Sequence, residues 1–199
     1  MLTVRAVALA TVAFFSAADA VAADAPDQAV RSATEKIQAL IKQHHGEYTR
    51  DKVKFYAAVD EVVAPAFDVP YVAQITLGRT WRTANDAQRA RFQAAFKNTL
   101  IHAYSDALLE YSDSSRVDWG RAAINGDDAS LHATVVRDAA PPVALGFQLH
   151  KTQGGDWRAY DITVEGVSLI TNFRSQFASE VKRDGLDALI QRLEANGSI

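Results

Sequence analysis

The sequence predicts an α+β fold, in which a layer of helices packs on one face of a curved antiparallel sheet. Before residue 112, apolar residues recur every three or four positions, as in amphipathic helices. From 116 to 165 they alternate with polar residues, and after Gly166 the helical spacing returns. No Pro/Gly/Ser-rich linker divides the chain. Helices, then strands, then helices therefore indicate one domain in which the two layers share a core.

The first 23 residues are expected to be a secretory signal peptide, outside the domain. Arg5 supplies a weak positive start, and the uncharged, mostly apolar stretch 6–18 is too short to span a bilayer. Val21 and Ala23 fit the −3 and −1 positions of a cleavage site, and cleavage after Ala20 is a close alternative. An N-terminal membrane anchor is the other interpretation of this segment.

The mature chain, 24–199, is long enough for one domain with a sizeable core. It has no Cys, which excludes disulfides, thiolate metal sites, a thiol nucleophile and a lipoprotein anchor. The formal net charge of −3 argues against a nucleic-acid-binding protein, which normally carries a basic patch.

Three helices are expected in the N-terminal part. The first covers 27–45, where apolar residues share one face and Gly46 lies just past the end. A second covers 49–63 and is closed by Pro65. A turn then leads into a short helix that ends at Gly78.

The longest periodic segment, 86–111, is expected to be an amphipathic helix. Thr83 or Asn85 is a suitable N-cap, and Asp86 is favourable in the first turn. The apolar face steps by three and four residues through Phe92, Ala95, Phe96, Thr99, Leu100, Ala103, Tyr104, Ala107, Leu108 and Tyr111.

Four strands joined by short turns are expected next, as an antiparallel meander. They cover 116–124, 131–135, 143–149 and 157–165, and Asn-Gly-Asp at 125–127 is a strong hairpin turn. Alternation places these apolar residues on one face of the last two strands: Val143, Leu145, Phe147, Leu149, Tyr160, Ile162 and Val164.

Helical spacing returns after the last strand. Gly166 opens a helix whose apolar face includes Ile170, Phe173 and Phe177. Gly185 interrupts it, and a last short helix follows.

Four sequence blocks resemble the MlaC-type periplasmic phospholipid-binding proteins, also called the toluene-tolerance or organic-solvent-resistance family. They are LGRTW at 77–81, QRARFQAAF at 88–96, WRAYDITVEGVSLITNFRSQF at 157–177 and GLDALIQRL at 185–193. The resemblance covers nearly all of the mature chain, although 111–142 matches only in its pattern.

This resemblance implies a nuclear-transport-factor-2-like architecture, with a strongly bent sheet and an apolar cavity between the layers. It also implies a periplasmic carrier of glycerophospholipid that helps to maintain outer-membrane lipid asymmetry. The implied partners are an outer-membrane lipoprotein–porin complex and an inner-membrane transporter complex with MCE-domain subunits and an ATPase. No enzymatic activity and no cofactor other than the phospholipid cargo are implied.

A phospholipid carrier needs a deep, dry cavity. Each methylene removed from water contributes about 0.8 kcal/mol, so two chains of roughly 16 carbons represent on the order of 20 to 25 kcal/mol. The same apolar faces could instead close on one another as an ordinary core, and the Tyr104 hydroxyl could lie near the headgroup or at the rim of a core. The candidate lipid-binding residues are Phe92, Phe96, Leu100, Tyr104, Leu108, Phe147, Leu149, Ile162, Val164, Val167 and Ile170.

A polar group lies where the last strand meets the following helix. Glu165 and Ser168 are expected to cap that helix, and Arg174 to pair with Glu165 or Asp161. The alternative is that Glu165 and Arg174 contact a lipid headgroup or a partner protein, since a cation near the mouth suits a phosphate.

Two other functions remain open. One is a small-molecule enzyme of the isomerase or dehydratase type, with Asp161 or Tyr104 as its base, although alternation points Asp161 away from the cavity. The other is an interaction module with a closed core. No phosphate-binding GxxxxGK loop or GxSxG elbow is present. His132 and His150 are possible neighbours on the polar face, but two histidines are a weak signal, and no metal site is expected.

Overall fold

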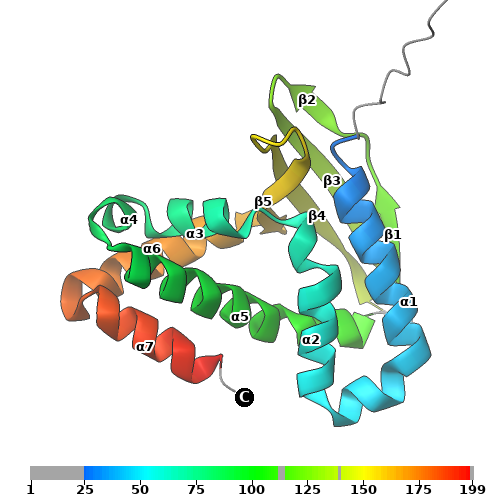
Figure 1. The fold of residues 1–199 in the computed structure, drawn as a ribbon. Helices are drawn as coiled ribbons and strands as arrows, with labels where there is room; N and C mark the ends of the chain where they lie inside the picture. Colours follow the sequence, from blue (N-terminus) through cyan, green and yellow to red (C-terminus); the bar gives the residue numbers. More distant parts are fainter. Residues whose placement is uncertain (1–24, 112–114, 139, 198–199) are drawn as a thin grey trace, which may run out of the picture.

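The computed structural model describes residues 25–111, 115–138 and 140–197, and the predicted signal peptide lies outside them. It confirms the α+β class: helices pack with a six-stranded antiparallel sheet (Figure 1). The elements are α1 (Gln28–Arg50), α2 (Lys52–Val62), η1 (Ala64–Ala66), α3 (Val69–Leu77), α4 (Arg79–Thr83), α5 (Asp86–Tyr111), β1 (Ser115–Trp119), β2 (Ala123–Asn125), β3 (Asp128–Arg137), β4 (Ala140–Lys151), β5 (Trp157–Val164), β6 (Val167–Ser168), α6 (Leu169–Asp184) and α7 (Leu186–Asn196).

Helix α1 is longer than predicted, because Gly46 does not end it. The helix bends at His44, whose φ and ψ are −119° and 17°, and continues to Arg50. The extra turn is useful because it buries Tyr48, whose ring packs between His44 and Phe55. Asp51 then caps α2 by accepting a hydrogen bond from the Lys54 amide at 3.1 Å.

The next helices begin and end at the expected signals, with one addition. Gly78, at φ +57°, ends α3, and a short helix that the sequence analysis did not predict, α4, follows at once. Asn85 caps α5: its side-chain oxygen accepts from the backbone N–H of Gln88 at 2.9 Å, and the Gln88 side-chain oxygen accepts from the backbone N–H of Asn85 at 3.1 Å.

The sheet has the order β1-β3-β4-β5-β6, and β2 also pairs with β3. The predicted strand 116–124 is wrong as a single element, because Gly120 divides it into β1 and β2. The Gly120 amide donates to the His132 carbonyl at 2.8 Å, and a Cβ at this position would lie only 3.1 Å from the same oxygen. A two-residue strand, β6, completes the six.

A bulge changes the facing of β5. Leu149 pairs with Ala159, but Phe147 pairs with Ile162, so the register shifts by one residue. Tyr160 is the extra residue, and its ring packs edge-on against Tyr71 on the other side of the sheet. The predicted alignment of Tyr160 with Ile162 on one face is therefore wrong.

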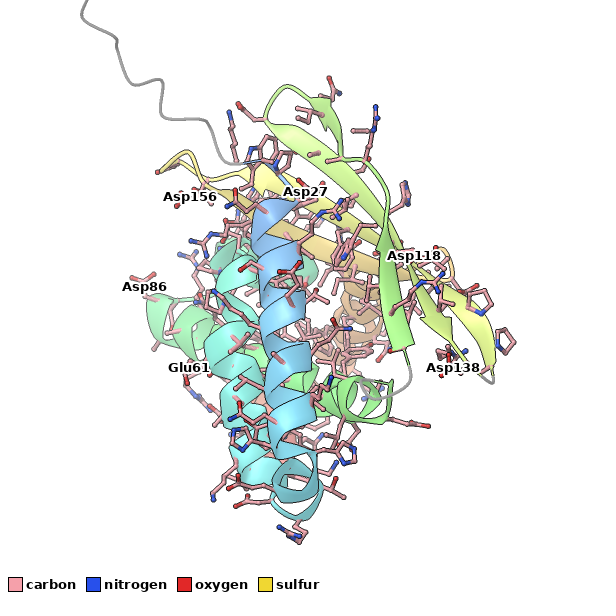
Figure 2. All side chains as sticks on the ribbon, turned by 90° about the vertical axis from the view of Figure 1, so that its right-hand side faces the viewer. Asp27, Glu61, Asp86, Asp118, Asp138 and Asp156 are labelled. Carbon is pink, nitrogen blue, oxygen red and sulfur yellow. The ribbon has the colours of Figure 1, made fainter. Side chains whose placement is uncertain are left out.

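The buried apolar residues form three clusters. The helical core joins α3, α5, α6 and α7; the sheet core joins the inner face of the sheet to Val30 of α1; and the hairpin core joins α1 and α2 to Leu109 of α5. Figures 1 and 2 show the corresponding shape: α1 crosses the sheet, and the helical core extends to one side. No described helix is long and apolar enough to cross a membrane.

Candidate functional site

The inner face of the sheet is closed at one end and partly open at the other. Toward the β2–β3 and β4–β5 turns, Leu131, Leu149 and Ala159 are fully buried in the sheet core, where Val30 also packs. Toward the β3–β4 turn, the face continues through paired apolar residues that are only half-buried: Val135 and Val143, then Leu145 and Val164.

Helix α5 shows the same change along its length. Phe92 and Phe96 are fully buried in the helical core and Leu100 is half-buried, whereas Tyr104 and Leu108 are 36% and 39% exposed. The helix ends only a few residues before β1, whose first residue pairs with the end of β3. The exposed end of α5 is thus tied to the same end of the sheet where the inner face opens (Figure 1).

The structure divides the eleven predicted lipid-binding residues into two groups. Five are buried in the cores: Phe92, Phe96 and Ile170 in the helical core, and Phe147 and Leu149 in the sheet core. Six retain exposed surface: Leu100, Tyr104, Leu108, Ile162, Val164 and Val167, of which Leu100 and Ile162 also pack against a core.

Tyr104 combines an exposed side chain with a partly dehydrated hydroxyl. Burial raises the pKa of the Tyr104 hydroxyl above its ordinary value, because the phenolate form loses hydration there. An amphipathic ring of this kind suits a boundary between an apolar surface and water.

The polar cluster at the start of α6 caps that helix and so has a structural role. Ser168 is the N-cap, as predicted, and accepts from the Thr171 amide at 3.0 Å. Asp161 adds a second cap that the sequence analysis did not assign: Oδ1 accepts from the Ile170 amide at 3.1 Å and Oδ2 from the Ser168 hydroxyl. The carboxylate considered as a catalytic base is therefore occupied by the helix, on the face of the sheet that carries Gln148.

Glu165 and Arg174 make other contacts than those predicted. Glu165, at φ +50°, accepts a hydrogen bond from the Ala144 amide at 2.5 Å, which ties the β5–β6 turn to β4. The Arg174 guanidinium lies against Gly78, where a Cβ would stand 3.4 Å from its Nε. Within the described residues, Arg174 forms no ion pair with Glu165 or Asp161.

A second polar group joins α3 to the outer face of the sheet. His150 Nε2 lies 3.0 Å from Asp68 Oδ2, and Asp68 also caps α3 by accepting from the Tyr71 amide at 3.0 Å. The Tyr71 ring stacks on His150 at 4.5 Å. The sequence signal for this group was Asp68 followed by Val-Pro, a typical helix start.

His132 and His150 are not neighbours. His132 pairs with Gly146, which is four residues along β4 from His150. No group of three His, Cys, Asp or Glu side chains that could hold a metal ion occurs in the part of the chain that the structure describes.

Two surface depressions lie away from the predicted lipid-binding residues. One, of about 390 Å³, lies between α5 and α7 beside Ala94 and Gly197. The other, of about 340 Å³, lies between the start of α1 and the β4–β5 turn, beside Ala29 and Trp157. Neither is lined by any of the eleven residues. The exposed large apolar side chains of the described residues are Val53, Tyr104, Leu108, Ile124 and Val167, and two of these, Tyr104 and Leu108, lie one turn apart on α5.

Comparison with known proteins identifies the family. Residues 31–195 match the sequence profile described as MlaC protein. The chain belongs to the MlaC family. This MlaC-family chain is 29% identical, over 168 residues, to toluene tolerance protein Ttg2D of Pseudomonas putida, a match that covers 84% of this chain and 78% of the relative. It is 21% identical, over 189 residues, to the intermembrane phospholipid transport system binding protein MlaC of Haemophilus influenzae, covering 94% and 88% of the two chains.

A solved structure extends the similarity to three dimensions. The phospholipid-binding protein from Ralstonia solanacearum, solved in complex with a phospholipid, matches this MlaC-family chain with a TM-score of 0.78 and 29% identity. The match covers 88% of this chain and 98% of the other. The predicted resemblance to the MlaC-type family is therefore confirmed.

Proposed function

We propose that this protein binds a glycerophospholipid and carries it through the periplasm. Membership of the MlaC family supports this function, as does the similarity to a protein solved with a phospholipid bound. The carrier would exchange lipid with an outer-membrane lipoprotein–porin complex and with an inner-membrane MCE-domain transporter complex, and so maintain outer-membrane lipid asymmetry. A signal peptide at residues 1–23 would direct it to the periplasm.

The observation that carries the proposal within the molecule is the open apolar surface at the end of α5. A single exposed apolar side chain is ordinary, but a contiguous apolar patch marks a binding site. We take Tyr104 and Leu108, one turn apart on α5, and the half-buried sheet face as two parts of such a patch. We place the acyl chains between these two surfaces. The proposed lining is Leu100, Tyr104, Leu108, Leu145, Ile162 and Val164.

The five buried candidates then support the lining from the cores and do not contact the lipid themselves. The stacked rings of Phe92 and Phe96 hold α5 against α6, and Leu149 holds the sheet against α1. Glu165 lies in the β5–β6 turn and Val167 begins β6, at the same end of the sheet, where they would form part of the rim near a headgroup or a partner.

Native mass spectrometry of protein purified from its own periplasm without detergent, followed by lipid extraction, tests the carrier function. We expect a stoichiometric glycerophospholipid adduct. A bare protein that also fails to take lipid from vesicles would contradict the proposal.

A matched pair of variants tests the location. Leu108→Asp places a carboxylate on the proposed lining, whereas Ile124→Asp makes the same change at a 60% exposed residue of the β2–β3 hairpin. We expect Leu108→Asp to lose the adduct and Ile124→Asp to keep it, with circular dichroism to check that both are folded. A folded Leu108→Asp protein that still carries lipid would place the acyl chains elsewhere.

A further inference from the structure

Two segments of this acidic protein contain no acidic residue. The chain has 24 Asp and Glu against 21 Lys and Arg, so an even distribution would place about four acids in 69–84 and 166–179 together. These segments instead carry no Asp or Glu and three arginines, Arg79, Arg82 and Arg174.

The fold brings these segments together on one surface. Helix α3 packs on α6, and the Arg174 side chain lies against Gly78, directly before Arg79 and α4. Figure 1 shows α4 and the neighbouring part of α6 at the end of the helical core that lies away from the sheet. We call the surface of Arg79, Arg82 and Arg174 the arginine face.

The charges of the arginine face are not neutralised within the molecule. All three side chains are exposed, and among the described residues none of them forms an ion pair or a side-chain hydrogen bond. The acidic residues that border the two segments along the chain are Asp68, Asp86, Glu165 and Glu180. Asp86, which Figure 2 shows projecting from the start of α5, pairs with Arg89, and Glu180 pairs with Arg192.

The exposed side of α6 next to Arg174 is polar but uncharged. Ser175 and Ser179 donate to carbonyls one turn back along the helix, each at 3.0 Å, and Gln176 donates to the Asn172 side chain, also at 3.0 Å. The surface therefore presents positive charge among polar side chains that already have partners. Its large apolar side chain, Trp81, is half-buried and packs against the helical core.

We infer that the arginine face binds the surface of bilayers that contain anionic phospholipids. A guanidinium donates two parallel hydrogen bonds to a phosphate, and here no neighbouring carboxylate competes for it. A protein partner would favour aromatic or apolar anchors beside the arginines, whereas Trp81 here packs against the helical core and under Arg89, and serine is depleted from such interfaces. The choice of a bilayer also rests on the proposed function, since a phospholipid carrier works beside membranes.

Such binding is weak, reversible and sensitive to salt. Each basic residue near an anionic surface contributes about a fivefold change in affinity, and the attraction is screened over about 10 Å at 0.1 M salt. Because α4 lies away from the open end of the inner face, the arginine face would hold the protein at a membrane without covering the proposed lipid site (Figure 1).

The test is vesicle flotation of the full mature chain. Phosphatidylglycerol–phosphatidylcholine vesicles are compared with pure phosphatidylcholine, at low and high salt. The variant Arg79→Gln/Arg82→Gln removes two charges from α4 and leaves the Arg174–Gly78 contact intact. The control Lys36→Gln/Lys42→Gln removes two charges from exposed positions of α1.

We expect wild type to bind the anionic vesicles at low salt only. The α4 variant should bind more than tenfold more weakly, and the α1 control within about twofold of wild type. Equal binding of wild type to both kinds of vesicle, no loss in the α4 variant, or an equal loss in the control would overturn the inference. So would a result in which wild type ignores vesicles but the α4 variant loses lipid exchange with a membrane complex, which would assign the face to an acidic protein.

Native mass spectrometry of the same samples separates this inference from the proposed function. The α4 variant should keep its phospholipid adduct. Wild type that binds anionic vesicles but carries no phospholipid would overturn the carrier function and leave the arginine face as a membrane-binding surface.

Discussion

The substitution Phe96→Ala tests whether Phe96 belongs to the helical core or lines the lipid site. Phe96 is 1% exposed, and its ring stacks on Phe92 at 5.5 Å and meets Phe173 and Phe177 edge-on at 5.2 and 5.3 Å. Truncating a buried Phe costs about 3 to 5 kcal/mol, and each aromatic pair adds about 0.5 to 1.5 kcal/mol beyond the area buried. We therefore expect a loss of about 5 kcal/mol, a large part of the stability of a typical domain.

A loss of this size lowers the melting temperature by about 10 to 20 °C in a chain of this length. The assay is unfolding of the delipidated protein by urea and by heat, with circular dichroism as the signal. Because the predicted loss comes from packing within the helical core, it should be present without lipid. Leu108→Ala, at an exposed residue, should change the stability of delipidated protein by less than about 0.5 kcal/mol and lower only the extra stability that bound lipid provides.

The result that would refute this reasoning is a delipidated Phe96→Ala protein as stable as delipidated wild type. Phe96 would then line a cavity that only the acyl chains fill, and the helical core would be looser than its ring contacts indicate. An equal loss in Leu108→Ala without lipid would likewise contradict the division between core and lining.

Three further predictions concern local structure. Asp161→Ala should cost about 1 to 2 kcal/mol in urea unfolding, because it leaves the Ile170 amide without its acceptor, and Asp161→Asn should cost less. Gly146→Ala should cost about 1 to 3 kcal/mol because its Cβ would overlap with the Thr163 hydroxyl; a double variant with Thr163→Ala that recovered nothing would rule out this cause. Burial raises the pKa of Tyr104 above 10.0, so the folded state keeps this proton longer than the unfolded chain and stability falls as pH rises past 10. Tyr104→Phe should reduce this loss of stability above pH 10, measured by urea unfolding, and should remove one high-pKa tyrosine from the tyrosinate absorbance titration. A variant whose unfolding and absorbance at high pH match those of wild type would contradict the prediction.

The helices could be predicted where local chemistry decides them. The N-cap and the three-four spacing of α5 depend on neighbours in the sequence: the sequence alone narrowed the cap to Thr83 or Asn85 and predicted the spacing, and the structure selects Asn85. Gly46 misled the prediction because its cost inside a helix is small, about 1 kcal/mol, compared with the gain from burying Tyr48 two residues later. Helix α4 was missed because five residues are too few to show a period.

The site was harder to predict because periodicity does not distinguish a core from a cavity wall. Phe92 and Leu108 belong to the same apolar stripe of α5, yet one is fully buried and the other is exposed. The difference depends on which elements pack against each turn of the helix, and those come from distant parts of the sequence. The predicted pairing of Arg174 with a carboxylate was wrong for the same reason, because its actual neighbour, Gly78, is distant in the sequence.

The bulge in β5 sets the phase of everything that follows it in the strand. If Tyr160 were kept but paired as a regular strand residue, strict alternation from Ala159 would turn Asp161 and Thr163 toward the inner face and Ile162 and Val164 toward the outer face. A carboxylate and a hydroxyl would then replace two hydrocarbon side chains on the wall where the acyl chains are proposed to lie. Homologues should therefore tolerate substitutions in β5 more readily than a one-residue insertion or deletion that leaves the bulge in place, because such a change in length reverses the facing of every residue on one side of it.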